Sequence, residues 1–94
     1  MAIPGFKDRR CAILFDGQCP KGFAPDLVRI ARRKLRAIDA AVAVRGLTEP
    51  PGNRLEKLRG ERAGQWSTRV NDQWRICLVW MDDGAHDVEI VDYH

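Results

Sequence analysis

The sequence has 94 residues, of which 45% are hydrophobic and 31% are charged, and its formal net charge is +3. A chain of this size builds one compact domain, which excludes a multidomain protein and a large buried pocket, so we expect a single domain over residues 1–94. No apolar run approaches the roughly 18 residues of a membrane span, and the opening MAIPGFKDRR lacks the apolar centre of a signal peptide, so we expect a cytoplasmic protein without membrane insertion.

The first expected element is a short helix. Asp8 is suited to the N-cap, and Cys11, Leu14 and Phe15 follow it at the i, i+3, i+4 spacing of one helix face. Gly17 is a suitable stop. The polar loop GQCPKGFAPD then leads to the next helix.

A long helix is predicted from Pro25 to about Val44, because proline suits the first helical turn and the apolar residues that follow recur at intervals of three and four. Those apolar residues are Leu27, Ala31, Leu35, Ile38 and Val42. Gly46 and the EPPG run at residues 49–52 end the helix, since two consecutive prolines neither continue a helix nor pair in a central strand.

The last third of the chain changes to the period of two that is typical of strands. In residues 66–70, Trp66, Thr68 and Val70 alternate with Ser67 and Arg69, and in residues 74–80 large apolar residues occupy every second position. The two runs flank the tight turn NDQ, and the turn DDGAH leads to a last strand from Val88. This pattern predicts an antiparallel meander. We therefore expect an α+β fold, in which two N-terminal helices pack on one face of an antiparallel sheet of about four strands.

Strand alternation assigns side chains to the two faces of this sheet. The expected core face carries Trp66, Val70, Ile76, Leu78, Val88 and Ile90. The opposite face carries Arg69 and Arg75 on neighbouring strands, and Tyr93 is in phase with them.

The charges are unevenly distributed along the chain. Residues 1–75 hold all 16 Lys and Arg with eight acidic residues, a net charge of +8, whereas residues 76–94 hold five acidic residues and a net charge of −5. Arginine binds phosphate well because its planar group donates two parallel hydrogen bonds and stays charged. The candidate phosphate-binding residues are Arg54, Lys57, Arg59, Arg62, Arg69 and Arg75. A solvated basic rim without a ligand is the alternative.

Tyr93 and His94 bring a phenol and an imidazole to the end of the last strand. Nearby arginines favour the tyrosinate, so Tyr93 is a candidate base, and the α-carboxylate of His94 favours the imidazolium, which suits an acid. Glu56, Glu89 and Asp92 are further candidate bases or orienting groups. In RNA, such a pair can deprotonate a 2′-hydroxyl and protonate the leaving 5′-oxygen, a route closed to DNA. An ordinary strand end is the alternative.

The cysteines do not indicate a disulfide framework or a metal site. Cys11, Cys19 and Cys77 form an odd set without a CxxC pattern or a Cys/His cluster, so we expect free thiols. No Gly-rich phosphate loop or metal-ligand spacing is present in the sequence, and we expect no cofactor and no metal.

The segment PPGNRLEKLRGERAGQWSTRVNDQWRICLVW and the ending DVEIVDYH closely resemble the HigB branch of the RelE/ParE toxin superfamily, and RRKLRAIDAA is similar to the long helix of that family. The resemblance implies a RelE-like fold in the toxin of a type II toxin–antitoxin system. It also implies ribosome-dependent cleavage of mRNA at the decoding site, and neutralisation by a HigA-type antitoxin with a helix-turn-helix domain.

The resemblance also assigns the functional residues. It implies catalytic roles for Arg75, Asp92, Tyr93 and His94, and phosphate binding by basic residues that follow the PPG turn, of which we select Arg54, Lys57, Arg59 and Arg69. Some family members carry a catalytic histidine where this chain has Glu56. A carboxylate repels the substrate phosphate and is a weaker base than imidazole, so slower or differently tuned cleavage is expected.

Two other functions remain open from the sequence. The related ParE branch shares the fold but inhibits DNA gyrase, which requires no acid/base pair. A basic module that binds RNA or the ribosome without cleaving it is the second alternative, and it predicts salt-sensitive binding without new RNA ends.

Overall fold

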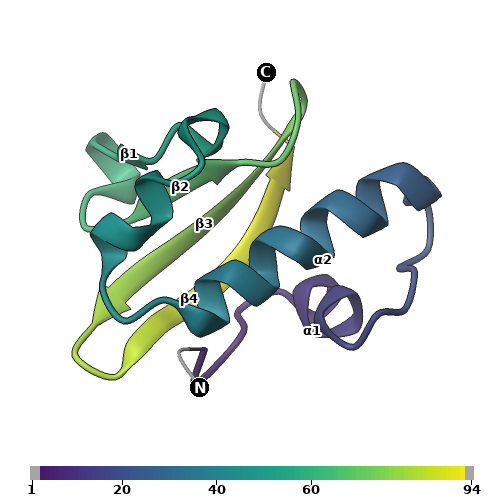
Figure 1. Cartoon of the computed structure of the whole chain (residues 1–94), viewed down its shortest axis with the longest axis horizontal. Coiled ribbons are helices and arrows are strands. Elements are labelled where there is room, and N and C mark those ends of the chain that lie inside the picture. Colours follow the sequence, from purple (N-terminus) through teal and green to yellow (C-terminus); the bar gives the residue numbers. More distant parts are fainter. Residues whose placement is uncertain (1–2, 93–94) are drawn as a thin grey trace.

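The computed structural model describes residues 3–92, and the roles expected for Tyr93 and His94 therefore concern residues outside the described range. Within that range the helices are α1 (Arg9–Phe15) and α2 (Pro25–Ala40), with the short 3-10 turns η1 (Val44–Thr48), η2 (Pro51–Asn53) and η3 (Gly60–Arg62). The strands are β1 (Glu56–Lys57), β2 (Trp66–Arg69), β3 (Trp74–Met81) and β4 (Gly84–Asp92). Figure 1 shows α2 lying across the sheet, with α1 beside it.

The short first helix is confirmed. Asp8 is its N-cap, and the carboxylate of Asp8 accepts a hydrogen bond of 2.9 Å from the backbone N–H of Arg10. The side chains of Cys11 and Leu14 are fully buried, as the i, i+3 spacing predicts. The capped helix therefore buries one narrow face.

The long helix begins at Pro25 as expected but ends at Ala40, so the prediction that it continues to about Val44 is wrong. Ala41 already has an extended backbone, and Val42, expected on the buried face, is 99% exposed. Because Val42 contacts no core surface at this position, its side chain does not stabilise a further helical turn. The chain then turns through η1 toward the sheet.

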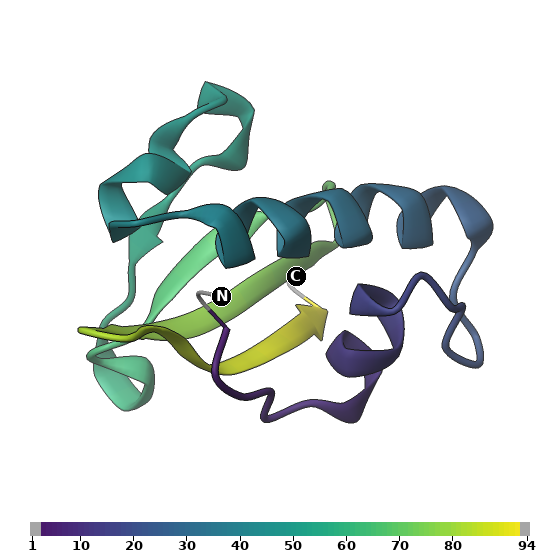
Figure 2. The same ribbon diagram turned by 60° about the horizontal axis from the view of Figure 1, so that its bottom comes forward.

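The antiparallel meander is confirmed, with the strand order β1-β2-β3-β4 and every neighbouring pair antiparallel. Figure 2 shows the sheet from a second direction, with α2 lying along one side of it. The register of β3 and β4 shifts between Cys77 and Val79, opposite Asp87, whose φ of 50° is left-handed. The extra residue on β4 allows Ala85 and Val88, which are three positions apart, both to lie in the core.

The helices and the inner face of the sheet share one hydrophobic core. Its buried members from α2, β3, β4 and the residue after β2 include Ala31, Leu35, Ile38, Val70, Ile76, Leu78, Val88 and Ile90. Trp66, expected in the core, is only partly buried and packs against its edge. No helix within residues 3–92 combines the length and the apolar character needed to cross a membrane.

The opposite face of the sheet is partly covered by the chain itself. Ser67 and Cys77, which are register partners on that face, are both 0% exposed, and Leu58 is 7% exposed. The backbone N–H of Leu58 donates to Gln65 across the loop that contains η3. That loop and its side chains therefore shield the middle of the face, while the arginines lie nearer one end.

Candidate functional site: an arginine-bearing sheet face

Two arginines lie side by side on the face away from α2. Arg69 of β2 and Arg75 of β3 are direct register partners, and Arg75 is in turn paired with Val91 of β4. Paired residues on adjacent strands project to the same side of the sheet. The structure therefore brings together the two sheet arginines that the alternation pattern placed on one face.

Arg75 is held by specific backbone and side-chain oxygens. Its Nε donates to the hydroxyl oxygen of Ser67 at 2.8 Å, and its Nη2 donates to the carbonyl oxygens of Arg54 at 2.7 Å and Ser67 at 3.3 Å. Arg54 has a left-handed backbone with φ of 46°, which is uncommon for a non-glycine residue. The PPGNR turn thus presents a carbonyl group to Arg75.

Arg69 forms an ion pair, and its charge also acts on Lys34 of α2. Its Nη2 donates to the carboxylate of Asp72 in the β2–β3 turn. Burial, followed by the charges of Arg33 and Arg69, lowers the pKa of Lys34 on α2. Lys34 in turn donates to Asn53, a nearly buried residue of η2. Lys34 was not identified from the sequence, because the helix periodicity does not reveal which polar residue of α2 contacts the η2 turn.

The two residues of β1 project to opposite sides. Glu56 pairs with Ser67 and therefore shares the face of Arg75, whereas Lys57 pairs with Trp66 and places its Nζ 5.8 Å from the centroid of that ring. Lys57, expected to bind phosphate, is thus directed away from the two sheet arginines. Arg59 is exposed in the following loop.

Glu89 and Arg62 form an ion pair across the covered part of the face. The carboxylate of Glu89 lies 3.3 Å from Nη2 of Arg62 and 3.2 Å from Nζ of Lys7, and its side chain is 14% exposed. This pair connects the η3 loop to β4 over the buried Cys77. Glu89 was a candidate base and Arg62 a candidate phosphate ligand, and the structure pairs the two with each other.

Asp92 stands at the end of β4 and is the register partner of Trp74. Strand alternation therefore directs its side chain to the face opposite Arg75. Its Oδ2 accepts a hydrogen bond of 3.1 Å from Nε2 of Gln73 in the β2–β3 turn. Tyr93 and His94 follow directly, outside the described residues, so the contact expected between them and the arginines stays a prediction.

The three cysteines are free thiols, as expected. Burial raises the pKa of Cys11 to about 12, and burial likewise raises the pKa of Cys77. Cys19 is exposed in the loop before α2. Among residues 3–92, no group of three or more His, Cys, Asp or Glu side chains is arranged to hold a metal ion.

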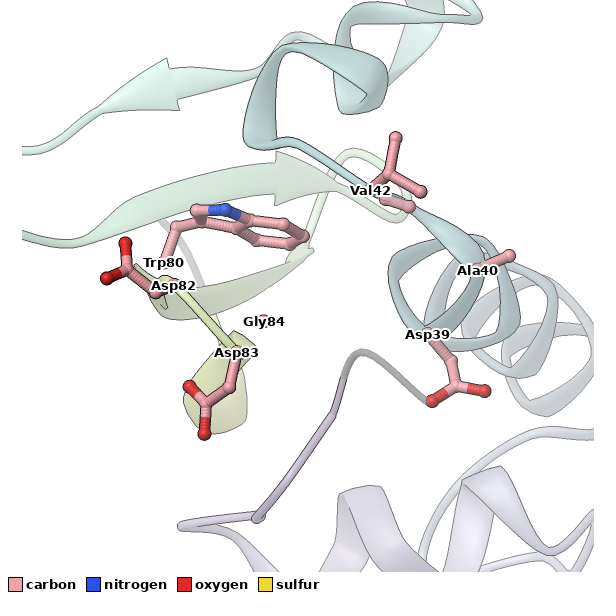
Figure 3. Close-up of a pocket in the computed structure, with 8 residues that line it drawn as sticks. Asp39, Ala40, Val42, Trp80, Asp82, Asp83 and Gly84 are labelled. Atoms are coloured by element: carbon pink, nitrogen blue, oxygen red, sulfur yellow. The ribbon is translucent and has the colours of Figure 1, made fainter.

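A shallow depression of about 320 Å³ lies between the end of α2 and the β3–β4 turn (Figure 3). Figure 3 shows Asp39 and Val42 on the helix side, and Trp80, Asp82 and Asp83 on the strand side. None of the lining residues within the described part of the chain is basic. The depression is thus acidic and apolar, and it lacks the arginines that a phosphate site requires.

Comparison with known protein families gives one family assignment. The model of the HigB-like toxins, described as RelE-like toxins of the type II toxin–antitoxin system HigB, matches residues 5–94. The protein named Toxin HigB-1 of Vibrio cholerae serotype O1 (strain ATCC 39315 / El Tor Inaba N16961) is 38% identical over 81 residues, which are 85% of this chain and 85% of that protein. Endoribonuclease HigB of Proteus vulgaris is 34% identical over 93 residues, which are 98% of this chain and 99% of that protein.

A solved structure supports the fold. The YoeB-YefM complex from Staphylococcus aureus contains a chain that superposes with a TM-score of 0.62, covering 98% of this chain and 94% of that chain. The two chains are 21% identical, so this likeness bears on the fold alone.

Proposed function

Because this chain belongs to the family of RelE-like toxins of HigB type II toxin–antitoxin systems, we propose that it is a single-domain endoribonuclease that cleaves mRNA on the ribosome. The loss of translated messages would inhibit translation and growth. The P. vulgaris relative, similar over nearly its whole length, is named an endoribonuclease, and that name supports the proposed activity.

The observation that carries the proposal is the register pairing of Arg69 with Arg75 on the sheet face away from the helices. Two arginines on facing positions of one sheet face suit a phosphodiester, because each guanidinium group can donate paired hydrogen bonds to its oxygens. Arg54 lies next to them in the η2 turn, since its carbonyl oxygen accepts from Nη2 of Arg75. We assign phosphate binding to Arg54, Arg69 and Arg75, with Lys57 and Arg59 contacting RNA farther from the reacting phosphate.

The reaction we propose uses the nucleophile of the RNA itself. A base on the protein takes the proton of a 2′-hydroxyl, the 2′-oxygen bonds to the adjacent phosphorus, and the bond to the 5′-oxygen breaks. An acid gives its proton to that 5′-oxygen, which leaves a cyclic phosphate on one fragment and a 5′-hydroxyl on the other. Arg75 stabilises the charge on the pentacoordinate phosphorus. No metal is needed in this scheme, because the nucleophile lies next to its target.

The candidate acid and base are Tyr93 and His94, which follow Asp92 at the end of β4, and Glu56, which shares the face of Arg75. Asp92 orients the end of the strand through its contact with Gln73. Glu56 takes the place of a histidine found in some family members, and its negative charge opposes the approach of phosphate. Cleavage slower than in histidine-bearing relatives is therefore expected.

The partners follow from the family. The antitoxin is a separate chain, which we propose to be of the HigA type with a helix-turn-helix domain. The other partners are mRNA and the decoding site of the ribosome, which places the activity in the cytoplasm.

The test is a translation reaction with intact ribosomes and a defined message, comparing the wild type with Arg75→Ala and Tyr93→Phe. We expect the wild type to produce new RNA 5′ ends within the decoding site, and both variants to lose them. Intact messages with wild-type toxin would contradict the proposal. Broken DNA after induction in cells, without cleaved RNA, would indicate inhibition of gyrase instead.

A further inference from the structure

We propose that Ser67 is a positioning residue for catalysis, because its buried hydroxyl group sets the direction of the Arg75 guanidinium. This inference rests on the function proposed above and adds a residue to it. Ser67 is 0% exposed, so it does not reach the solvent from which RNA approaches. Any effect of Ser67 on cleavage must therefore pass through a neighbouring group, and the structure identifies that group as Arg75.

The contact is specific in geometry. Ser67 of β2 is paired with Cys77, so Arg75, two residues before Cys77 on β3, is its diagonal neighbour on the same face. The hydroxyl oxygen of Ser67 accepts from Nε of Arg75 at 2.8 Å, and the carbonyl oxygen of Ser67 lies 3.3 Å from Nη2. The carbonyl oxygen of Arg54 accepts from the same Nη2 at 2.7 Å. These oxygens fix the edge of the guanidinium that carries Nε and Nη2.

The chemistry of these acceptors suits a group that must bind an anion. Hydroxyl and carbonyl oxygens are neutral, so these contacts orient the guanidinium without cancelling its charge. The ion pairs of Arg62 with Glu89 and of Arg69 with Asp72 place a carboxylate against the arginine instead. A serine hydroxyl is therefore a better support for a phosphate-binding arginine than an aspartate at the same position would be.

The neighbouring Thr68 shows that a buried hydroxyl group on β2 does not by itself contact the arginine. Thr68 is 2% exposed on the core side of the same strand, and within residues 3–92 its Oγ1 has no hydrogen-bond partner. Apolar β-branched side chains are favoured at such buried strand positions. Ser67 and Thr68 thus form a matched pair of adjacent buried hydroxyl groups, of which only the first contacts the arginine.

The experiment measures single-turnover cleavage in the ribosome assay for Ser67→Ala, Ser67→Thr and Thr68→Val. We expect Ser67→Ala to lower the cleavage rate about 10- to 100-fold, the range set by one hydrogen bond to a charged group, with little change in ribosome binding. Ser67→Thr, which keeps the hydroxyl, should restore most of the rate. Thr68→Val removes the neighbouring hydroxyl and should cleave as the wild type does.

A purely structural role of Ser67 is separated by a double-mutant cycle with Arg75→Lys, which keeps a positive charge but lacks the Nε donor. If Ser67 acts through Arg75, Ser67→Ala should cause no further loss in the lysine background. A loss of equal size in both backgrounds would overturn the inference. Ser67→Cys, which keeps the side-chain volume but offers only a weak sulfur acceptor, replaces Ser67→Ala in the cycle if the alanine variant does not fold.

The hydrogen bond can be observed without any activity. The Nε–H signal of Arg75 in a ¹⁵N NMR spectrum, assigned by its absence in Arg75→Lys, should exchange slowly with solvent in the wild type and rapidly in Ser67→Ala. A slowly exchanging signal in a wild type that does not cleave RNA would overturn the proposed function while the contact stands. Cleavage by Ser67→Ala at the wild-type rate would overturn the role of Ser67 while the function stands.

Discussion

Arg69 and Arg75 are direct register partners on β2 and β3, so two positively charged side chains rise from facing positions of one sheet face. Like charges directly opposite each other in a sheet are destabilising. The contacts of Arg69 with Asp72 and of Arg75 with Ser67 hold the two groups in this arrangement. A phosphate between or above the guanidinium groups would relieve their repulsion, which is the physical reason to regard this face as an anion site.

The first prediction concerns the salt dependence of RNA binding. Arg69→Gln should weaken binding of single-stranded RNA and reduce the slope of log affinity against log salt by about 0.7, the value for one lost phosphate contact. The free energy of unfolding should change by less than about 1 kcal/mol, because the ion pair with the fully exposed Asp72 contributes little. Salt titrations of binding by fluorescence anisotropy measure the slope.

The control for Arg69→Gln is Arg29→Gln. Arg29 lies on α2 with its side chain 77% exposed, next to Asp26, whose side chain is 90% exposed. The Arg29→Gln substitution removes the same charge from a surface that we do not assign to RNA binding. An equal reduction of the slope in both variants would show that net charge, rather than the arginine-bearing face, determines binding.

The second prediction concerns Asp8, which joins α1 to the edge of the sheet. Its carboxylate caps the helix through the N–H of Arg10, accepts from the guanidinium of Arg10 at 2.8 Å, and accepts from the N–H of Ile90 at 3.3 Å. Asp8→Ala should lower the free energy of unfolding by about 2 kcal/mol, since it removes a cap and a charged hydrogen bond. Chemical denaturation at neutral pH measures the loss.

The same residue predicts a pH dependence. Burial alone would raise the pKa of Asp8, but the hydrogen bonds and charge of Arg10 and the Ile90 N–H outweigh it and lower the pKa below its usual value. A carboxyl group with a lowered pKa stabilises the fold above its unfolded pKa of about 3.9, and this contribution is lost as the pH falls through the folded value. The stability difference between the wild type and Asp8→Asn should therefore shrink from about pH 5 to about pH 2.

The sequence predicts the fold more completely than the site, and particular residues show why. The cap at Asp8, the start at Pro25 and the meander follow from local patterns, because the backbone of each element depends on its own side chains. Strand alternation also places Arg69 and Arg75 correctly, since their register depends on a short turn.

The contacts around those arginines depend on segments that fold back from elsewhere in the chain. The carbonyl oxygen of Arg54 reaches Arg75 because of a left-handed turn, and Arg62 of the η3 loop pairs with Glu89 of β4. The periodicity of the sequence does not predict such long-range contacts. Strand alternation places Ser67 and Thr68 on opposite faces, but it does not reveal that the hydroxyl group of Ser67 accepts from Nε of Arg75 whereas that of Thr68 has no partner within residues 3–92.

The third prediction concerns the thiols. Cys11 and Cys77 are both 0% exposed, and burial raises the pKa of Cys11 to about 12 and raises that of Cys77 as well, whereas Cys19 is exposed. A thiol reagent such as DTNB should therefore modify one cysteine rapidly in the native protein and all three in denaturant. Cys19→Ser should abolish the rapid phase. A second rapidly reacting thiol would indicate that the core around Cys11 or the sheet face above Cys77 opens in solution.

The fourth prediction concerns stability in the core. Thr68→Val should raise the free energy of unfolding by about 1 kcal/mol, because it replaces a buried hydroxyl group that has no partner within residues 3–92 by a methyl group of similar size. Thermal denaturation of the two proteins measures the difference. A lower melting temperature for the valine variant would show that the hydroxyl is satisfied in solution.

The fifth prediction concerns Glu56, which is paired with Ser67 and so lies on the face that carries Arg75. Glu56→His should raise the rate of ribosome-dependent cleavage by up to about 10-fold near neutral pH, since imidazole titrates near neutrality and a base is most effective when its pKa is close to the working pH. The variant also removes a negative charge that repels the phosphate. Cleavage rates measured across a pH series report both effects.

Glu56→Gln separates the two causes, because it removes the charge without adding a base. If repulsion is the main obstacle, the glutamine and histidine variants should be equally fast and their rates should depend on pH in the same way. If a base is missing, only the histidine variant should gain, with a rate that rises as the imidazole loses its proton. A loss of cleavage in both variants would show that the carboxylate of Glu56 is itself the general base. This chain would then use a glutamate for the step in which some relatives use a histidine.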